Sequence, residues 1–280
     1  MAKLPANQPL QDRDGQPLTT LAAINRLPVA EKEAVYAGLL PPRLLSLLQI
    51  DPQTLCNLDG QRLVQVIAPD GLGLVRIEVR HRPEAPDTTF FVELADSQYH
   101  QMEFAFCIIA DPTAPRFAVD VTEAGTLNYF TSHGRNLPEE LRAMAAGLYP
   151  NQTRRGLRLF GDFFPRLERF TDRLGMEMII AEPLSYDNAI RYERYGFDYL
   201  TGKRLMLEID RAFQPGGRLF KRLDGSSPFR MPGMERTVRG RSWAIHDGIL
   251  DEPWDGVQIY KMIGTDAGID TFPGREQEAQ

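Results

Sequence analysis

The stretch that decides the fold is residues 176–202, which read MEMIIAEPLSYDNAIRYERYGFDYLTG. Its first six residues are an apolar run of strand length, and residues 185–195 carry apolar side chains at helical spacing. Gly196 is placed to end this helix, because glycine readily adopts the left-handed conformation in which many helices terminate. We therefore predict a strand, a helix and a further strand, the last of them at residues 203–209.

The residues before this stretch predict a helix that packs on a sheet. Asp162 is suited to cap it and Gly175 to end it. Between them lies an apolar stripe made of Phe163, Phe164, Leu167, Phe170 and Leu174. Because Pro165 lacks a backbone N–H, we expect it in the first turn of this helix.

Further upstream, the sequence predicts an antiparallel meander. Turn residues such as Asp70 and Gly71 separate several strand-like runs, at residues 62–68, 74–82, 88–94, 102–110 and 116–122. Short connections of this kind favour antiparallel pairing. Residues 257–263 are a last strand candidate. The predicted fold class is therefore α/β of the α+β kind, with a mixed, mostly antiparallel sheet flanked by helices.

The remaining segments complete the predicted organisation. Residues 1–60 predict an N-terminal helical extension: a loose arm over residues 1–17, then helices at 21–27, 29–40 and 42–50. Asn136 predicts the start of another helix, because asparagine is a favoured N-cap residue. The main domain is expected over residues 61–264, with an irregular insertion rich in Gly and Pro at 213–256. Residues 265–280 are expected to form a flexible tail.

The bulk composition narrows the function classes. The chain has 280 residues, of which 42% are hydrophobic, as is ordinary for a globular protein. Its formal net charge of −6 argues against binding driven by the phosphates of a nucleic acid. No run approaches the roughly 18 apolar residues that a membrane span needs, and the polar start is unlike a signal peptide. We expect a cytoplasmic protein with neither a nucleic-acid nor a membrane partner.

The metal-binding residue types show no useful spacing. Cys56 and Cys107 do not form a paired-cysteine motif, so we expect neither a disulfide nor a thiolate zinc site, and Cys107 should be a small buried apolar residue. The four histidines are scattered, which predicts no metal site. His133 lies in a predicted loop and is the one histidine that we keep as a catalytic candidate.

Residues 181–197, AEPLSYDNAIRYERYGF, are similar to a motif of the GNAT (acyl-CoA N-acyltransferase) superfamily. In that motif a strand precedes the pattern N-x-x-A-x-x-x-Y-E-x-x-G-F. The helix at 163–174 also resembles the long helix that follows the family's cofactor loop, and the element order over residues 62–263 resembles the family's order. The resemblance implies a GNAT-like fold. It also implies transfer of an acyl group from acetyl-CoA or another acyl-CoA to a primary amine of a small molecule or peptide.

The family's cofactor loop, Gln/Arg-x-x-Gly-x-Gly/Ala, is matched only in part. Three registers are possible, at residues 155–160, 153–158 and 158–163, and each of them replaces at least one required residue. Bulky side chains there oppose a close approach of backbone to phosphate, whereas guanidinium groups suit phosphate well. The resemblance therefore implies a degenerate loop, with candidate cofactor-binding residues Arg154, Arg155, Gly156, Arg158 and Gly161. The family strand before this loop is expected at residues 116–122 or 146–150.

The resemblance also implies residues for the chemistry. Tyr192 matches the family tyrosine that protonates the leaving thiolate, in a cleft where two motif strands splay; the alternative is a core aromatic residue. A strand carboxylate acts as base or positions a water, for which Asp120 and Glu123 are candidates, with Glu103 on the preceding strand. The alternative is that these are solvated carboxylates. Counting back from Tyr192, Ser185 takes the place of the family's cofactor-contacting Asn, while Asn188 falls where Ala is usual.

Two other function classes compete with an acyltransferase. The degraded loop favours a catalytically inactive GNAT-like module that binds a ligand or a partner. The arginines of residues 152–173 and 218–241 favour a nucleotide or polyanion binder. Residues 218–241 carry seven basic residues against Asp224 and Glu235, which predicts either a solvated loop or an anion site. The sequence does not indicate the oligomeric state.

Overall fold

The computed structural model describes residues 8–128 and 133–273, and within them the chain forms two compact units. Unit 1 comprises residues up to 113, 156–181 and 260–266. Unit 2 comprises residues 114–155, 182–259 and those from 267 onward. Each unit therefore combines segments that lie far apart in the sequence, so its core cannot be read from one continuous stretch.

The predicted mixed, mostly antiparallel sheet is confirmed. Its strands are joined in the order β1-β2-β3-β4-β5-β7-β6. Their bounds are β1 Val64–Ile67, β2 Leu74–Val79, β3 Phe90–Asp96, β4 Met102–Ile109, β5 Met178–Ala181, β6 Asp198–Thr201 and β7 Gln258–Met262. The first four form the expected meander, in which each strand pairs antiparallel with the next. The pairing of β4 with β5 is parallel.

The helices α1 Leu21–Asn25, α2 Val29–Ala37 and α3 Pro42–Leu47 are fastened to the sheet of unit 1. The Asp96 carboxylate at the end of β3 accepts hydrogen bonds from the first backbone N–H groups of α1, those of Leu21 and Ala22, each at 2.9 Å. The buried Asn25 donates to the carbonyls of Leu72 and Leu74 and accepts from the Tyr36 hydroxyl. These bonds connect α1 and α2 to the strands of unit 1, to which residues up to 113 belong.

The expected loose arm is wrong for the residues that the structure describes. Leu10 and Leu18 are buried, and Gln11 forms a β-bridge with Pro17. The Leu10 N–H also donates to the carbonyl of Arg173 at 3.0 Å. Residues 8–18 are therefore a packed turn, because two leucines spaced around a polar tip can both reach the core.

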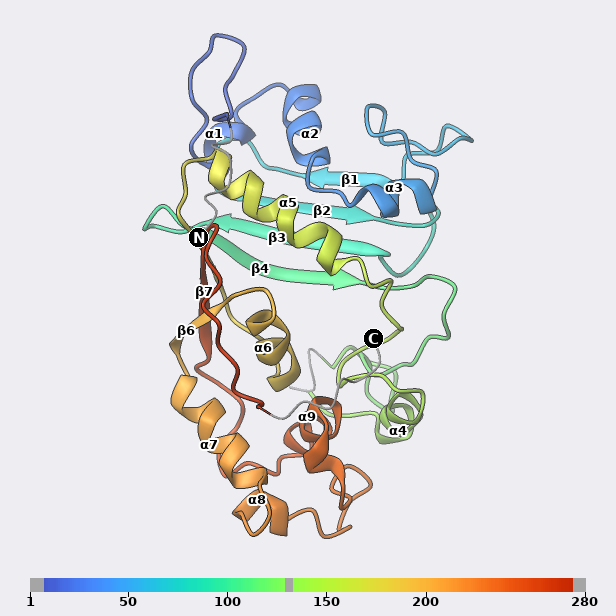
Figure 1. Cartoon of the computed structure of the whole chain (residues 1–280). Coiled ribbons are helices and arrows are strands. Elements are labelled where there is room, and N and C mark those ends of the chain that lie inside the picture. The colour runs from blue at the N-terminus through green and yellow to red at the C-terminus, as the bar shows by residue number, and fades with distance from the viewer. Residues whose placement is uncertain (1–7, 129–132, 274–280) are drawn as a thin grey trace. The chain divides into compact units, whose positions relative to one another are not determined.

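The long helix of unit 1 is α5, Phe160–Arg173, which lies across the meander (Figure 1). Its Phe163 ring packs on Phe90 of β3 at 5.4 Å and on Phe104 of β4 at 6.0 Å between ring centroids. The helix ends as predicted, with Gly175 at a φ of 73°. It begins earlier than predicted, however. Leu159 is the N-cap and Asp162 lies inside the first turn, which places Pro165 in the helix interior instead of in the first turn.

Unit 2 consists mainly of helices around a separate core. They are α4 Leu137–Ala145, α6 Tyr186–Glu193, α7 Lys203–Phe213, α8 Arg218–Lys221, the short 3-10 helix η1 Met234–Arg236 and α9 Val238–His246. Asn136 caps α4 as predicted, since its side chain accepts from the Glu139 N–H. The core gathers residues from three segments: Phe117, Val119, Ala143, Leu148, Phe229 and Trp243. The segment 213–256, expected to be irregular, thus supplies helices and a buried tryptophan.

The strand predicted at residues 116–122 is wrong. Its backbone bonds to side chains and loops instead of to a sheet: the Ala118 N–H donates to the Glu139 carboxylate, and the Ala118 carbonyl accepts from Asn136. Alternate side chains, Phe117 and Val119, still point into a core, which explains the strand-like pattern. Residues 146–150 follow the end of α4 and form turns and irregular structure instead of a strand.

The strand predicted at residues 203–209 is wrong, and the tail predicted at residues 265–280 is described only up to residue 273. Residues 203–209 belong to α7, where the buried Met206, Ile209 and Phe213 have helical spacing. The tail was expected to be flexible, yet Thr271 is buried and its N–H donates to Glu193 at 3.1 Å. A buried carboxylate that needs hydrogen-bond donors holds this part of the tail in place.

Candidate functional site

The first candidate region is the connection from β4 through α5 to β5 in unit 1. Of the eight residues of β4, only Met102 and Glu103 pair with β5, opposite Ile179 and Ile180. The rest of β4 continues beyond the end of this parallel pairing. The family strand expected at residues 116–122 or 146–150 is at neither place, and β4 is the strand that pairs parallel with β5.

The loop before α5 holds the predicted cofactor residues. A Cβ on Gly156 would come within 3.1 Å of the Ile109 carbonyl oxygen, so glycine allows this loop to pass close to the end of β4. Arg158 has a φ of 57° and is exposed, as are Arg155 and Gly161. Arg154, in unit 2, donates from its guanidinium to the Ala114 carbonyl. These placements leave two of the three arginine side chains directed to solvent.

The predicted residues on α6 belong to unit 2. Tyr192 is half-buried, and its ring lies 5.3 Å from that of Phe197. Ser185 is the N-cap of α6, but its hydroxyl donates to the Asp187 carboxylate at 2.8 Å instead of capping the helix. Asn188 is half-buried on the same helix. Its role and that of Tyr192 remain predictions.

Of the three predicted carboxylates, only that of Glu103 is on a strand. Asp120 is ion-paired with Arg116 at 2.6 Å in the irregular segment before α4, and Glu123 is exposed there. Glu103 is on β4 and is exposed. His133 is exposed and lies just outside the undescribed residues 129–132. Cys107 and Cys56 are free thiols that are both half-buried, so Cys107 is less buried than predicted.

Residues 218–241 were expected to form either a solvated loop or an anion site. Most of their arginines form ion pairs with carboxylates of unit 2. Arg218 and Arg222 both pair with Asp251, and Arg230 pairs with Asp247 at 2.9 Å. Arg241 is 4% exposed at its side chain and pairs with Asp210 at 2.8 Å. It also lies over the Phe272 ring at 4.2 Å, and burial of the nearby Tyr186 raises the pKa of that phenol to about 12. This region is a structural ion-pair network.

A second buried network in unit 2 centres on Glu140. Its carboxylate accepts from Arg135 and lies 3.2 Å from Nε2 of His246, and Arg135 also pairs with Asp247 at 2.8 Å. Burial by itself would raise the pKa of Glu140, but the hydrogen bonds from His246 and Arg135 outweigh it and hold that pKa below its ordinary value. Because each charge has an opposite partner, this cluster also serves the fold.

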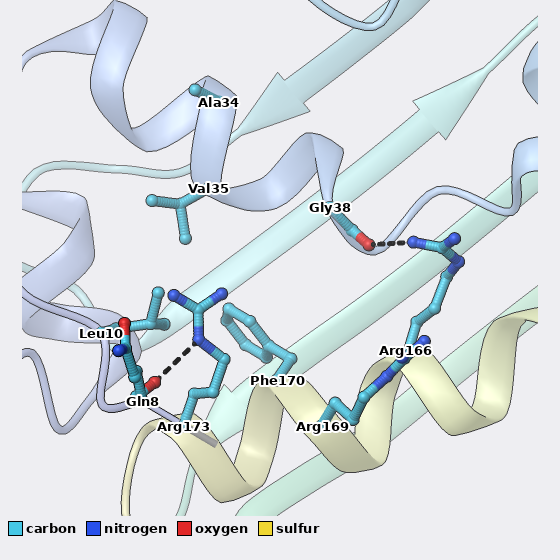
Figure 2. Close-up of a pocket in the computed structure, with 9 residues that line it drawn as sticks. All are labelled: Gln8, Leu10, Ala34, Val35, Gly38, Arg166, Arg169, Phe170 and Arg173. Carbon is cyan, nitrogen blue, oxygen red and sulfur yellow. Dashed lines mark hydrogen bonds between the residues drawn. The ribbon is translucent and has the colours of Figure 1, made fainter.

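Unit 1 has a cavity of about 750 Å³ between α2 and α5 (Figure 2). We call it the arginine cavity. Its lining residues are Gln8, Leu10, Ala34, Val35, Gly38, Arg166, Arg169, Phe170 and Arg173. The Phe170 ring is held on the Tyr36 ring, with 6.1 Å between their centroids, so one wall of the cavity is fixed by the core.

The three arginines of this cavity come from one face of α5. They are spaced by three and four residues, which places their side chains above one another on the helix. Figure 2 shows Arg166 donating to the Gly38 carbonyl at 3.2 Å and Arg173 donating to the Gln8 carbonyl at 3.1 Å. In the sequence these arginines are part of the basic stretch of residues 152–173. The i, i+3, i+7 spacing of its arginines was the available signal.

Neither metal nor membrane features appear in the part of the chain that the structure describes. Within residues 8–128 and 133–273, no three His, Cys, Asp or Glu side chains are grouped so that they could hold a metal ion. The same residues include no helix with the length and apolar character needed to cross a membrane.

No family model, curated protein or solved structure matches the chain.

Proposed function

We propose that this chain is an N-acyltransferase of the GNAT type that moves an acyl group from acyl-CoA to a primary amine. The observation that carries the proposal is the pair of parallel strands β4 and β5, which pair over two residues each. The long amphipathic helix α5 directly precedes β5, and residues 110–159, which include α4, come between β4 and α5. The motif of residues 181–197 directly follows β5, which supports the same assignment.

The chemistry requires one nucleophile and two proton transfers. The amine nitrogen attacks the thioester carbonyl carbon, a C–N bond forms and the C–S bond breaks. The nitrogen loses a proton, and the departing thiolate gains one. We assign the second transfer to Tyr192, because a tyrosine with an ordinary pKa of about 10 is protonated at neutral pH and can give a proton to a thiolate. A carboxylate, Asp120 or Glu123, is the candidate for receiving the amine proton.

The loop before α5 departs from the family pattern, and the proposal accounts for this with its arginines. Arg155 and Arg158 are exposed, so their guanidinium groups are open to a diphosphate. Charge-assisted hydrogen bonds from guanidinium to phosphate are about twice as strong as neutral ones. In this proposal the arginines supply attraction that the family obtains from backbone N–H groups.

Calorimetric titration with acetyl-CoA, and with ADP as the free-nucleotide comparison, tests binding first. We expect acetyl-CoA to bind more tightly than ADP, and the Arg154→Ala/Arg155→Ala/Arg158→Ala variant to bind acetyl-CoA more weakly. Release of free CoA thiol in the presence of a panel of primary amines then tests turnover. Unchanged affinity in the triple variant would show that the loop is only solvated.

The Tyr192→Phe variant separates catalysis from binding. It keeps the ring and deletes the hydroxyl, so turnover should fall about a hundredfold or more while affinity for acetyl-CoA is retained. Tyr260→Phe, on β7, is the matched control and should keep full turnover. Binding of acetyl-CoA without turnover of any amine would favour the catalytically inactive module instead.

A further inference from the structure

The arginine cavity carries positive charge that the fold does not neutralise. Arg166 and Arg173 donate to backbone carbonyls, which bear no net charge, and the described residues give Arg169 neither a hydrogen bond nor an ion pair. No carboxylate is among the described residues that line the cavity. Three guanidinium groups thus share one concave surface without a counter-ion from this part of the chain.

Four of the five carboxylates of α2 and α5 are paired with basic residues outside the cavity. On α2, Glu31 pairs with Arg13 and Glu33 pairs with Arg62. On α5, Asp162 pairs with Arg43 and Glu168 pairs with Lys261. The fold therefore directs these four carboxylates to basic residues outside the cavity, and Asp172, the remaining acidic residue of α5, does not line it.

A purely structural role explains only part of this arrangement. Arg173 lies in the last turn of α5, where a positive charge interacts favourably with the helix dipole. That explanation does not extend to Arg166 and Arg169, which lie further from the helix end. Like charges four residues apart, such as Arg169 and Arg173, also destabilise a helix.

We propose that the arginine cavity binds a small organic polyanion of the nucleoside di- or triphosphate class. Arg166 to Arg173 spans roughly 10 Å along the helix axis, which suits an extended chain of phosphates rather than one ion. Each guanidinium presents five N–H donors, and most of those on the cavity arginines are not used by the protein.

The organic part of the ligand is inferred from the other wall. Leu10, Ala34, Val35 and Phe170 add apolar lining beside the arginines. The volume of about 750 Å³ lies within the range of cavities that enclose ligands of nucleotide size. A ligand with an anionic end and a ring system can use both kinds of lining.

Calorimetric titration of the full chain with ATP, tripolyphosphate, citrate and adenosine tests this proposal. ATP should bind most tightly, and its affinity should fall as salt is added, because the attraction is screened. Arg169→Ala should weaken ATP binding about tenfold or more, the usual effect of losing a charge-assisted hydrogen bond. Arg43→Ala is the matched control: it removes one arginine of unit 1 outside the cavity and should leave ATP affinity within about twofold.

Each of the following outcomes would overturn the proposal, a part of it, or the assignment of the loop. Absence of ATP binding, or equal affinity in Arg169→Ala and the native chain, rejects the site. Tripolyphosphate binding as tightly as ATP rejects the nucleoside part, and citrate binding as tightly rejects the preference for phosphate. Acetyl-CoA binding should survive Arg169→Ala. Its loss there, with the loop variant unaffected, would place acetyl-CoA in this cavity and reject the assignment of the loop.

Discussion

Residues 218–241 of unit 2 and the helix α5 of unit 1 are both rich in arginine, but the arginines of the two regions have different partners. In the first region Arg218, Arg222, Arg230 and Arg241 each reach a carboxylate. In the second, the arginines of the cavity reach carbonyls or remain without a partner among the described residues. Residues 218–241 carry seven basic residues against two acidic ones, and α5 carries three of each. The partners of the arginines, and not their number, distinguish a structural network from a candidate anion site.

This difference indicates which arginines of the chain are available to a ligand. A buried arginine with a carboxylate partner contributes to the fold, and its loss leaves an uncompensated charge. An arginine that faces a cavity without such a partner contributes little to the fold and remains available to a ligand. Loss of an ion-paired arginine should therefore lower stability, whereas loss of an arginine of the cavity should weaken ligand binding and leave stability nearly unchanged.

The largest effect is expected for Arg241→Met. This change removes the buried guanidinium that pairs with the half-buried Asp210 and leaves that carboxylate only its hydrogen bond from Gln214, which should lower the free energy of unfolding by about 3 kcal/mol. Both tryptophans, Trp243 and Trp254, are in unit 2, so urea unfolding followed by tryptophan fluorescence reports on this unit. Arg204→Met removes an exposed arginine of α7 and should cause no measurable change. A loss of less than about 1 kcal/mol in Arg241→Met would contradict the structural role.

An intermediate effect, dependent on pH, is expected for Glu140→Gln. The variant loses the charged partner of Arg135 and His246 and should be less stable by about 1.5–3 kcal/mol at neutral pH. The pKa of Glu140 is lowered in the folded state, so its contribution is complete above the ordinary value of 4.5 and is lost as the pH falls through the folded pKa.

Urea unfolding at a series of pH values checks this second prediction. The difference between the native chain and Glu140→Gln should narrow as the pH is lowered from about 6 to about 3. Glu252→Gln, an exposed carboxylate of the same unit, is the control and should show no such narrowing. A constant difference over this range would mean that the charge of Glu140 does not stabilise the fold.

The smallest effect is expected for Arg169→Ala. Because Arg169 lacks a partner among the described residues and has a like charge four residues away, its removal should change the free energy of unfolding by no more than about 0.5 kcal/mol, in the stabilising direction. The gain should be larger at about 0.01 M than at about 1 M salt. Far-UV circular dichroism of urea unfolding measures it, since unit 1 has no tryptophan.

Arg43→Ala sharpens the last prediction because it makes the opposite kind of change in the same unit. It breaks the ion pair with Asp162 at 3.1 Å and should be neutral or slightly destabilising. Loss of an arginine from a buried ion pair would destabilise the chain by more than about 1 kcal/mol. If Arg169→Ala had such an effect, Arg169 would contribute to the fold as Arg241 does, and the difference between the two arginine-rich regions would be wrong.

Local sequence patterns predicted much of the fold. The meander of β1 to β4, the cap at Asn136 and the helix end at Gly175 depend on residues within a turn or two of one another. Alternation of side chains was a weaker guide, since residues 116–122 alternate as a strand does and yet bond to side chains of α4. The apolar residues of α7 were assigned to a strand because a short apolar segment fits either period.

The candidate sites were harder to predict, because each depends on residues distant in the sequence. Arg135 and Asp247 are 112 residues apart, and Arg43 and Asp162 are 119 residues apart. The arginine cavity needs α2 to lie opposite α5, which the spacing of residues 166–173 does not indicate. The carboxylates proposed for catalysis fell outside strands because the long insertion before α5 joins unit 2 rather than the sheet of unit 1.

The sequence by itself determined where most helices and strands of this protein form, because propensity, capping and turn chemistry act between near neighbours. It also determined how many arginines α5 carries and on which face they lie. Only the tertiary structure decided which arginines are neutralised, because a charge is compensated by whatever side chain the fold brings within a few ångströms, regardless of sequence distance. That choice separates the ion-paired residues of unit 2 from the open arginines of unit 1.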